Sequence, residues 1–126
     1  MTKFSLIEVQ VINQALKNVA LETGIVLQNS AFSPNIRERL DFSSAILDSE
    51  CRLVAQAEHI PVHLGAMPES VRCIVSYIGL DNLLEGDIYI GNNPYYGGTH
   101  LPDITVVKPI LYQQQLVGYI ANRCHH

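Results

Sequence analysis

The strongest constraint on the fold is a pair of β-rich runs near the end of the chain. Residues 104–111 and 116–123 carry many aliphatic and β-branched side chains, and three glutamines at 113–115 separate them. Two such runs with a short polar connection predict an antiparallel β-hairpin. A chain with this hairpin must build the rest of its fold around a sheet.

The centre of this hairpin decides which side chains meet at its open end. If the hairpin is centred on Gln114, Asp103 lies opposite His125 on one face of the sheet. His126 then lies opposite Pro102 on the other face. A one-residue slip of the register would instead place His126 opposite Asp103.

The first third of the chain predicts one long amphipathic helix. Apolar side chains recur at spacings of three and four over residues 5–28, the period of a helix with one buried face. Ser5 and Glu8 match a capping box at its start, and Gly24 is a weak point near its end. A breaker, Ser33-Pro34-Asn35, follows.

A second hairpin is predicted in the middle of the chain. Residues 42–47 and 52–56 have the pattern of two strands, and the polar residues 48–51 have the chemistry of a turn. Pro61 disfavours a helical conformation at Ile60. We therefore expect residues 60–62 to be extended.

A second helix and a short strand complete the predicted elements. Pro68 suits the first turn of a helix that reaches Ile78, and Gly79 suits its end. Residues 88–90 predict a strand. The order of elements predicts an α+β fold, and the length suggests that residues 1–126 form a single domain.

The composition excludes several classes of function. The net charge is −4 with eight Lys and Arg and no basic cluster, so we expect no binding to nucleic acid. No apolar run approaches the ~18 residues of a membrane span, so we expect no membrane partner. Three cysteines without a C-x-x-C spacing indicate free thiols in a reducing compartment, which favours the cytoplasm. The charged fraction of 16% is low, which fits a surface partly covered by other protein or a modestly polar compact domain.

A candidate metal site lies between the glycine-rich loop and the last hairpin. His100 and Asp103 stand three residues apart, after the double glycine 97–98 and around Pro102. With His125 opposite Asp103, the set is two imidazoles and one carboxylate, which suits Zn, Mn or Fe(II). The alternatives are a hydrogen-bonded structural histidine, an aspartate that ends a strand, and a terminal His-His that begins an affinity tag.

Other residues are weaker candidates for chemistry. His59 and His63 would share one side of an extended segment and could move protons, or could be hydrogen-bonded structural residues. Arg37 and Asp41 belong to a charged stretch that is either a solvated loop or presents these two residues to substrate. Cys124 should face away from His125, so we do not expect it to bind metal. The sequence contains neither common phosphate-binding glycine motif and no nucleophile elbow.

Four linked motifs resemble one known family. They are Arg37-Glu38-Arg39-Leu40-Asp41-Phe42-Ser43, Arg52-Leu53-Val54-Ala55-Gln56, His59-Ile60-Pro61-Val62-His63-Leu64-Gly65-Ala66-Met67 and Asn93-Pro94-Tyr95-Tyr96-Gly97-Gly98-Thr99-His100-Leu101-Pro102-Asp103-Ile104. In this order they are similar to the N-terminal part of the hydantoinase B/oxoprolinase family. Cys51 is a departure, because the family usually has glycine at that position in the turn.

The resemblance implies a function for the chain. Family members are several times longer, so the chain resembles the N-terminal portion of a larger hydantoinase B-type subunit. It implies an ATP-dependent amidohydrolase that opens cyclic amides or imides, with a divalent metal (Mn, Zn or Fe) on a set like His100, Asp103 and His125. ATP would be bound by a hydantoinase A-type partner subunit in a hetero-oligomer. The family similarity also makes the terminal His-His look native rather than a tag.

Two other functions remain open from the sequence. The same family includes subunits of acetone and acetophenone carboxylases, in which a metal would stabilise an enolate. A truncated chain could also be a non-catalytic assembly domain that keeps the fold and subunit contacts.

Overall fold

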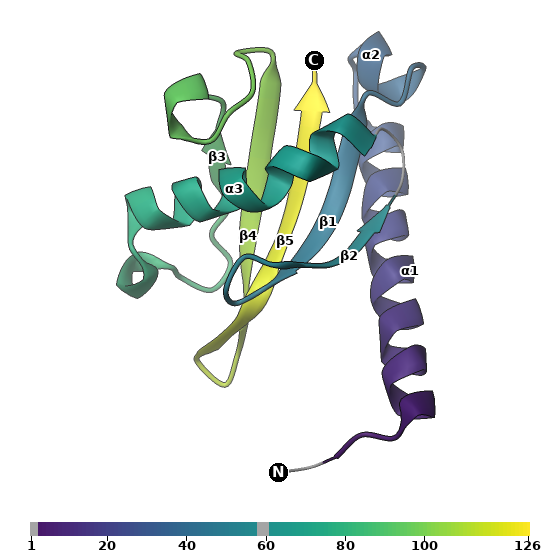
Figure 1. The fold of residues 1–126 in the computed structure, drawn as a ribbon. Helices are drawn as coiled ribbons and strands as arrows, with labels where there is room; N and C mark the ends of the chain where they lie inside the picture. Colours follow the sequence, from purple (N-terminus) through teal and green to yellow (C-terminus); the bar gives the residue numbers. More distant parts are fainter. Residues whose placement is uncertain (1–2, 58–60) are drawn as a thin grey trace.

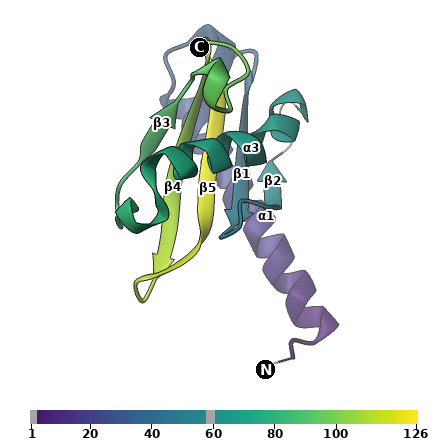
Figure 2. The same cartoon turned by 60° about the vertical axis from the view of Figure 1, so that its left-hand side comes forward.

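The protein is built on one antiparallel sheet with a helix on each face. The computed structural model describes residues 3–57 and 61–126, except the side chains of residues 61–64. The strands are β1 (Phe42–Asp48), β2 (Leu53–Ala57), β3 (Tyr89–Gly91), β4 (Asp103–Tyr112) and β5 (Gln115–His125). Their spatial order is β2-β1-β5-β4-β3. Helix α3 (Pro61–Ile78) crosses one face, and helix α1 (Leu6–Ser30) lies on the other, beside β1 and β2 (Figures 1 and 2). The predicted α+β class is confirmed.

Helix α1 begins as predicted and continues further than predicted. Its N-cap is Ser5, whose Oγ accepts a hydrogen bond from the Glu8 N–H at 3.2 Å. The Glu8 carboxylate accepts the Ser5 N–H in return at 2.7 Å, which completes the capping box. The helix passes through Gly24 and ends at Ser30. Ala20 and Gly24 are its buried residues, and their small size lets the helix approach the sheet closely.

Helix α3 corrects one prediction. It begins at Pro61 and runs to Ile78 with Pro68 in its interior, so the expected extended conformation is wrong for residues 61–62. Proline suits the first helical position because the N–H that it lacks has no partner there anyway. The start of the helix was therefore assigned to the wrong proline. Ile60 lies outside the described residues.

The first hairpin is confirmed, and its turn contains an unusual backbone angle. Strands β1 and β2 pair antiparallel from Ser44–Ala57 to Leu47–Leu53. Cys51 lies in the turn at φ +62°, a region that L residues other than glycine rarely adopt. The thiol is buried in the core under α3, and burial raises its pKa. This conformation explains why glycine would suit the position.

The strain at Cys51 yields a stability prediction. Cys51→Val should destabilise the fold by about 1–2 kcal/mol, because a β-branched side chain is strongly disfavoured at positive φ. Cys124→Val is the matched control: Cys124 is also buried, but it lies in β5, where branched side chains fit. Urea unfolding of both variants measures the difference. Equal stabilities would mean that the turn relaxes without cost.

The last hairpin has the predicted register at its open end but a different turn. Residues 113 and 114 form the two-residue turn, with φ of 49° and 64°, as in a type I′ turn. The register then shifts, because Leu111 pairs with Leu116 whereas Ile110 pairs with Gly118. The extra residue, Val117, is a β-bulge. Beyond it the pairing leads to Asp103 opposite His125, so this predicted pair is confirmed.

Three short helical segments were not predicted, and one strand lies one residue later than expected. The segments are α2 (Pro34–Arg37), η1 (Leu80–Asn82) and η2 (Pro94–Tyr96). Strand β3 covers residues 89–91 instead of 88–90. Both α2 and η2 begin at a proline, and the sequence pattern around Pro34 predicts only a breaker. None of the helices within residues 3–57 and 61–126 combines the length and apolar character needed to cross a membrane.

The main core lies between α3 and the sheet. Its buried residues come from α3, from the α3-facing side of the strands, from the β1–β2 turn and from the residue after η1: Ala45, Leu47, Cys51, Met67, Val71, Val75, Leu83, Val107, Tyr119 and Ala121. A smaller cluster under α1 joins Ala20 to Ile46, Ala55 and Ala57. Because side chains alternate along a strand, Asp103, Thr105, Arg123 and His125 share the α3 side with Val107 and Ala121.

Candidate metal centre

Asp103 and His125 face each other at the open end of the last hairpin. Asp103 is the first residue of β4 and pairs with His125, the last residue of β5. The Asp103 side chain is 3% exposed, and the His125 side chain is 29% exposed. The His125 N–H donates to the backbone carbonyl of Asp41 at 3.0 Å, which fixes the end of β5. The carboxylate is therefore held at the edge of the core, next to an imidazole that solvent can reach.

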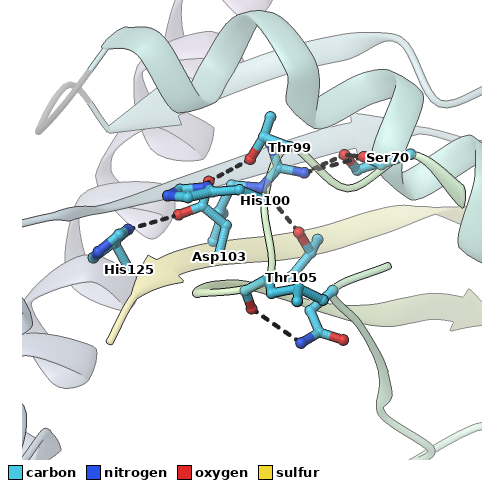
Figure 3. Close-up of polar contacts among 10 residues, drawn as sticks. Ser70, Thr99, His100, Asp103, Thr105 and His125 are labelled. Carbon is cyan, nitrogen blue, oxygen red and sulfur yellow. Dashed lines mark hydrogen bonds and ion pairs between the residues drawn. The ribbon is translucent and has the colours of Figure 1, made fainter. Parts of the chain in front are cut away.

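His100 reaches the same carboxylate from the loop that precedes β4. Its Nδ1 lies 2.7 Å from Asp103 Oδ2, whereas His125 Nδ1 lies 3.2 Å from Oδ1. The Thr99 hydroxyl donates to Oδ2 as well. In Figure 3 both histidines lie beside Asp103, and the centroids of their imidazole rings are 4.9 Å apart.

The double glycine lets this loop lie directly on α3. Gly97 has φ +78°, and an added Cβ would lie 2.9 Å from Cα of Ser70 and 2.9 Å from Cβ of Cys73. A Cβ on Gly98 would lie 2.7 Å from the carbonyl oxygen of Asn93. A larger residue in place of Gly97 would push the loop away from the helix, and one in place of Gly98 would clash with the backbone of the loop itself. The backbone that leads to His100 is thus positioned by close packing.

The three side chains fit a divalent metal by their chemistry and spacing. One potential donor atom from each of His100, Asp103 and His125 lies within 4.8 Å of the others. Metal–ligand bonds of ~2.0–2.2 Å need donor atoms within ~4 Å of one another, so small side-chain rotations suffice. The His100 side chain is 54% exposed, which leaves one side of the group open to water or substrate. Two imidazoles and one carboxylate are a donor set suited to Zn, Mn or Fe(II).

A fully buried arginine lies beside this group. Arg123 pairs with Thr105 across β4 and β5, and its Nε donates to Thr105 Oγ1 at 2.9 Å. Its terminal Nη2 donates to the Ser70 hydroxyl and lies 3.4 Å from the Gly97 carbonyl oxygen. Burial lowers the pKa of the Arg123 guanidinium, and the negative charge of Asp103 opposes this shift.

The structure describes the other predicted site residues only in part. His63 belongs to helix α3, so the extended segment expected to align it with His59 does not exist at residues 61–63. The position of His59 lies outside the described residues, and the side chain of His63 is not described. Arg37 is exposed at the end of α2. Asp41 contributes its backbone carbonyl next to His125.

His126 and Cys124 do not belong to the group of possible ligands found among the described residues. The His126 N–H donates to the Pro102 carbonyl at 3.3 Å, and its side chain is exposed. Cys124 packs with Ile36 and Phe42 on the other side of the sheet, where burial raises its pKa to about 11. His125 is therefore the better candidate of the two terminal histidines.

Sequence reasoning missed three residues around the site: Ser70, Thr99 and Arg123. The alternation of β5 could have indicated Arg123, because it shares the face of Ala121 and Tyr119, both fully buried. An arginine at such a position needs partners. Ser70 and Thr99 carry no comparable signal, since their role depends on how the loop and α3 meet.

Comparison with known proteins identifies the family. The hydantoinase B/oxoprolinase family model matches residues 5–126. The chain belongs to this family. An uncharacterised protein of Methanocaldococcus jannaschii, MJ0963, is 51% identical over 95% of the chain. 5-Oxoprolinase 1 of Arabidopsis thaliana is 44% identical over 95% of the chain. The crystal structure of the ATP-dependent caprolactamase from Pseudomonas jessenii matches 90% of it with a TM-score of 0.67 and 28% identity.

The chain spans only a small part of these relatives. It covers 22% of the M. jannaschii protein, 9% of the plant 5-oxoprolinase and 20% of the caprolactamase chain. His100, Asp103 and His125 all lie within the residues that match the family model.

Proposed function

We propose that this chain forms the metal-binding part of an ATP-dependent enzyme that opens cyclic amides or imides. The observation that carries the proposal is the convergence of His100, Asp103 and His125 within 4.8 Å of one another. It is supported by the 44% identity to a 5-oxoprolinase and by the likeness to an ATP-dependent caprolactamase. A hydantoin, 5-oxoproline and caprolactam all contain a cyclic amide, so we assign that substrate class.

The three side chains have distinct tasks in this proposal. A divalent metal bound here would supply Lewis-acid polarisation of a carbonyl oxygen or a water of lowered pKa. Asp103, buried and hydrogen-bonded by Thr99, would be the most firmly held of the three ligands. His100 is the most exposed of the three and borders the side from which substrate enters. His63 remains a candidate for proton transfer, with His59, Arg37 and Asp41 as weaker candidates.

We assign ATP binding to a hydantoinase A-type partner subunit. That subunit would phosphorylate the substrate carbonyl and pass the activated species to this site. The exposed apolar side of α1 supports contact with further protein: Leu6, Ile7 and Val26 are each more than half exposed. We place the hetero-oligomer in the cytoplasm on the strength of its free thiols, Cys51, Cys73 and Cys124.

The metal site is tested first by metal content and affinity. We expect the chain to bind one equivalent of Mn²⁺, Zn²⁺ or Fe²⁺, and His100→Ala to lower the affinity at least ~10-fold by removing one donor. His126→Ala is the matched control, because this neighbouring histidine lies outside the donor group. A wild-type chain without metal affinity, or a His126→Ala variant as weak as His100→Ala, would contradict the assignment.

Substrate class is tested on the assembled enzyme. The chain with its ATP-binding partner is offered 5-oxoproline, hydantoin and caprolactam, each with and without bicarbonate. ATP-dependent ring opening without bicarbonate supports the proposal. Turnover that requires bicarbonate would instead indicate a carboxylase, and partner binding without any turnover would indicate an assembly domain.

A further inference from the structure

We infer that Arg123 is a positioning residue for the metal centre, which holds the His100 loop against both α3 and the sheet. This inference rests on the metal site proposed above. Arg123 is fully buried, and the structure gives it contacts in three separate segments. These are Thr105 in β4, Ser70 in α3 and Gly97 in the loop, at 2.9 Å for Thr105 Oγ1 and 3.4 Å for the Gly97 carbonyl oxygen.

The place of these contacts explains why they matter for metal binding. Gly97 is three residues from His100, and Thr105 is two residues from Asp103. The Ser70 hydroxyl of α3 also donates to the Gly97 carbonyl. Helix α3 and Arg123 therefore both contact the same carbonyl oxygen of the loop. The guanidinium is planar and rigid, with five donors in fixed directions. One side chain therefore fixes the distance between the loop that carries His100 and the strand that carries Asp103.

Burial of the Arg123 guanidinium costs desolvation free energy, so packing alone does not explain an arginine at this position. Nη1 of Arg123 has no hydrogen-bond partner in the part of the chain that the structure describes. An apolar side chain of similar volume would avoid that desolvation cost. The negative charge of Asp103 favours the charged guanidinium and offsets only part of this cost, because burial still lowers the pKa of Arg123. Arginine and metal ligand are thus coupled by position and by charge.

Two substitutions separate positioning from simple structural support. Arg123→Lys keeps the charge but cannot reach Thr105 and Ser70 together. Thr105→Val removes only the acceptor of the Arg123 Nε and contacts no proposed ligand. Arg72→Lys is the control, since Arg72 is an exposed arginine of α3 that pairs with Glu69. Zn²⁺ affinity is measured by calorimetric titration, the ligand field by the absorption spectrum of the Co²⁺ form, and folding by thermal unfolding without metal.

The expected result is a loss of metal affinity in a folded protein. Arg123→Lys should bind Zn²⁺ ~10–100-fold more weakly and Thr105→Val ~10-fold more weakly, both with altered Co²⁺ spectra, while Arg72→Lys matches wild type. If Arg123→Lys does not fold, Thr105→Val decides. Variants that unfold at lower temperature but bind Zn²⁺ with wild-type affinity would overturn the inference alone. A wild-type chain without Zn²⁺ affinity would overturn the proposed metal site itself.

Discussion

Asp103→Asn is expected to lower the metal affinity of the chain by more than ~100-fold, because the loss of a direct ligand should cost more than the ~10–100-fold typical of an outer-shell partner. Asp103 contacts both histidines, at 2.7 Å for His100 and 3.2 Å for His125. Asparagine has nearly the same shape and can still accept the Thr99 hydroxyl. It lacks the negative charge and offers a single oxygen. The variant therefore tests the ligand chemistry with little change in packing.

The measurement is a competition titration of Zn²⁺ against a chromophoric chelator, with circular dichroism as a check on the fold. Asp81→Asn is the control, because Asp81 is an exposed aspartate in η1. Wild-type affinity in Asp103→Asn would mean that the carboxylate does not ligate the metal. The hydrogen bonds seen here would then describe a structural cluster.

The sequence predicts the pairing of Asp103 with His125, and the structure has this pairing although the hairpin turn differs from the expected one. A turn centred on Gln114 was assumed, but residues 113 and 114 form the turn. With that turn and no bulge, every residue pair between β4 and β5 would be shifted by one residue, and Asp103 would lie opposite Cys124. The bulge at Val117 adds the missing residue and restores the predicted pairing. A bulge has no clear signal in a sequence of aliphatic residues, so the pairing could not have been derived with certainty.

Proline and arginine positions mark the limit of the sequence-based prediction. Pro61 and Pro68 are both compatible with a helix start, and only tertiary packing of α3 on the sheet selects the earlier one. The extended backbone predicted for residues 61 and 62 is wrong for the same reason, whereas His59 lies outside the described residues and its alignment with His63 stays a prediction. The sequence pattern places Arg123 in a strand but does not indicate its hydrogen-bond partners, because Ser70 and Gly97 lie far away in the sequence. Local patterns predict elements, whereas contacts between distant segments complete the site.

Gly118→Ala is expected to have the largest effect on stability, with a loss of about 3 kcal/mol. An added Cβ would lie 2.3 Å from the carbonyl oxygen of Leu47, far inside van der Waals contact. Backbone cannot rotate away as a flexible side chain can, and Gly118 pairs with Asp48 on one side and Ile110 on the other. Gly65→Ala is the control: a Cβ there meets nothing within 4 Å, and alanine in helix α3 should stabilise by about 0.5–1 kcal/mol.

Urea unfolding measures the free energies of both variants, and a Gly118→Ala protein as stable as Gly65→Ala would contradict the close packing of β5 on β1. Metal affinity separates two ways in which the sheet could respond. Gly118 lies seven residues from His125, or roughly 23 Å along a strand at ~3.3 Å per residue. A local clash at that distance should leave the ligands in place. If the bulge at Val117 slipped instead, Cys124 would replace His125 opposite Asp103, and metal affinity would fall together with stability.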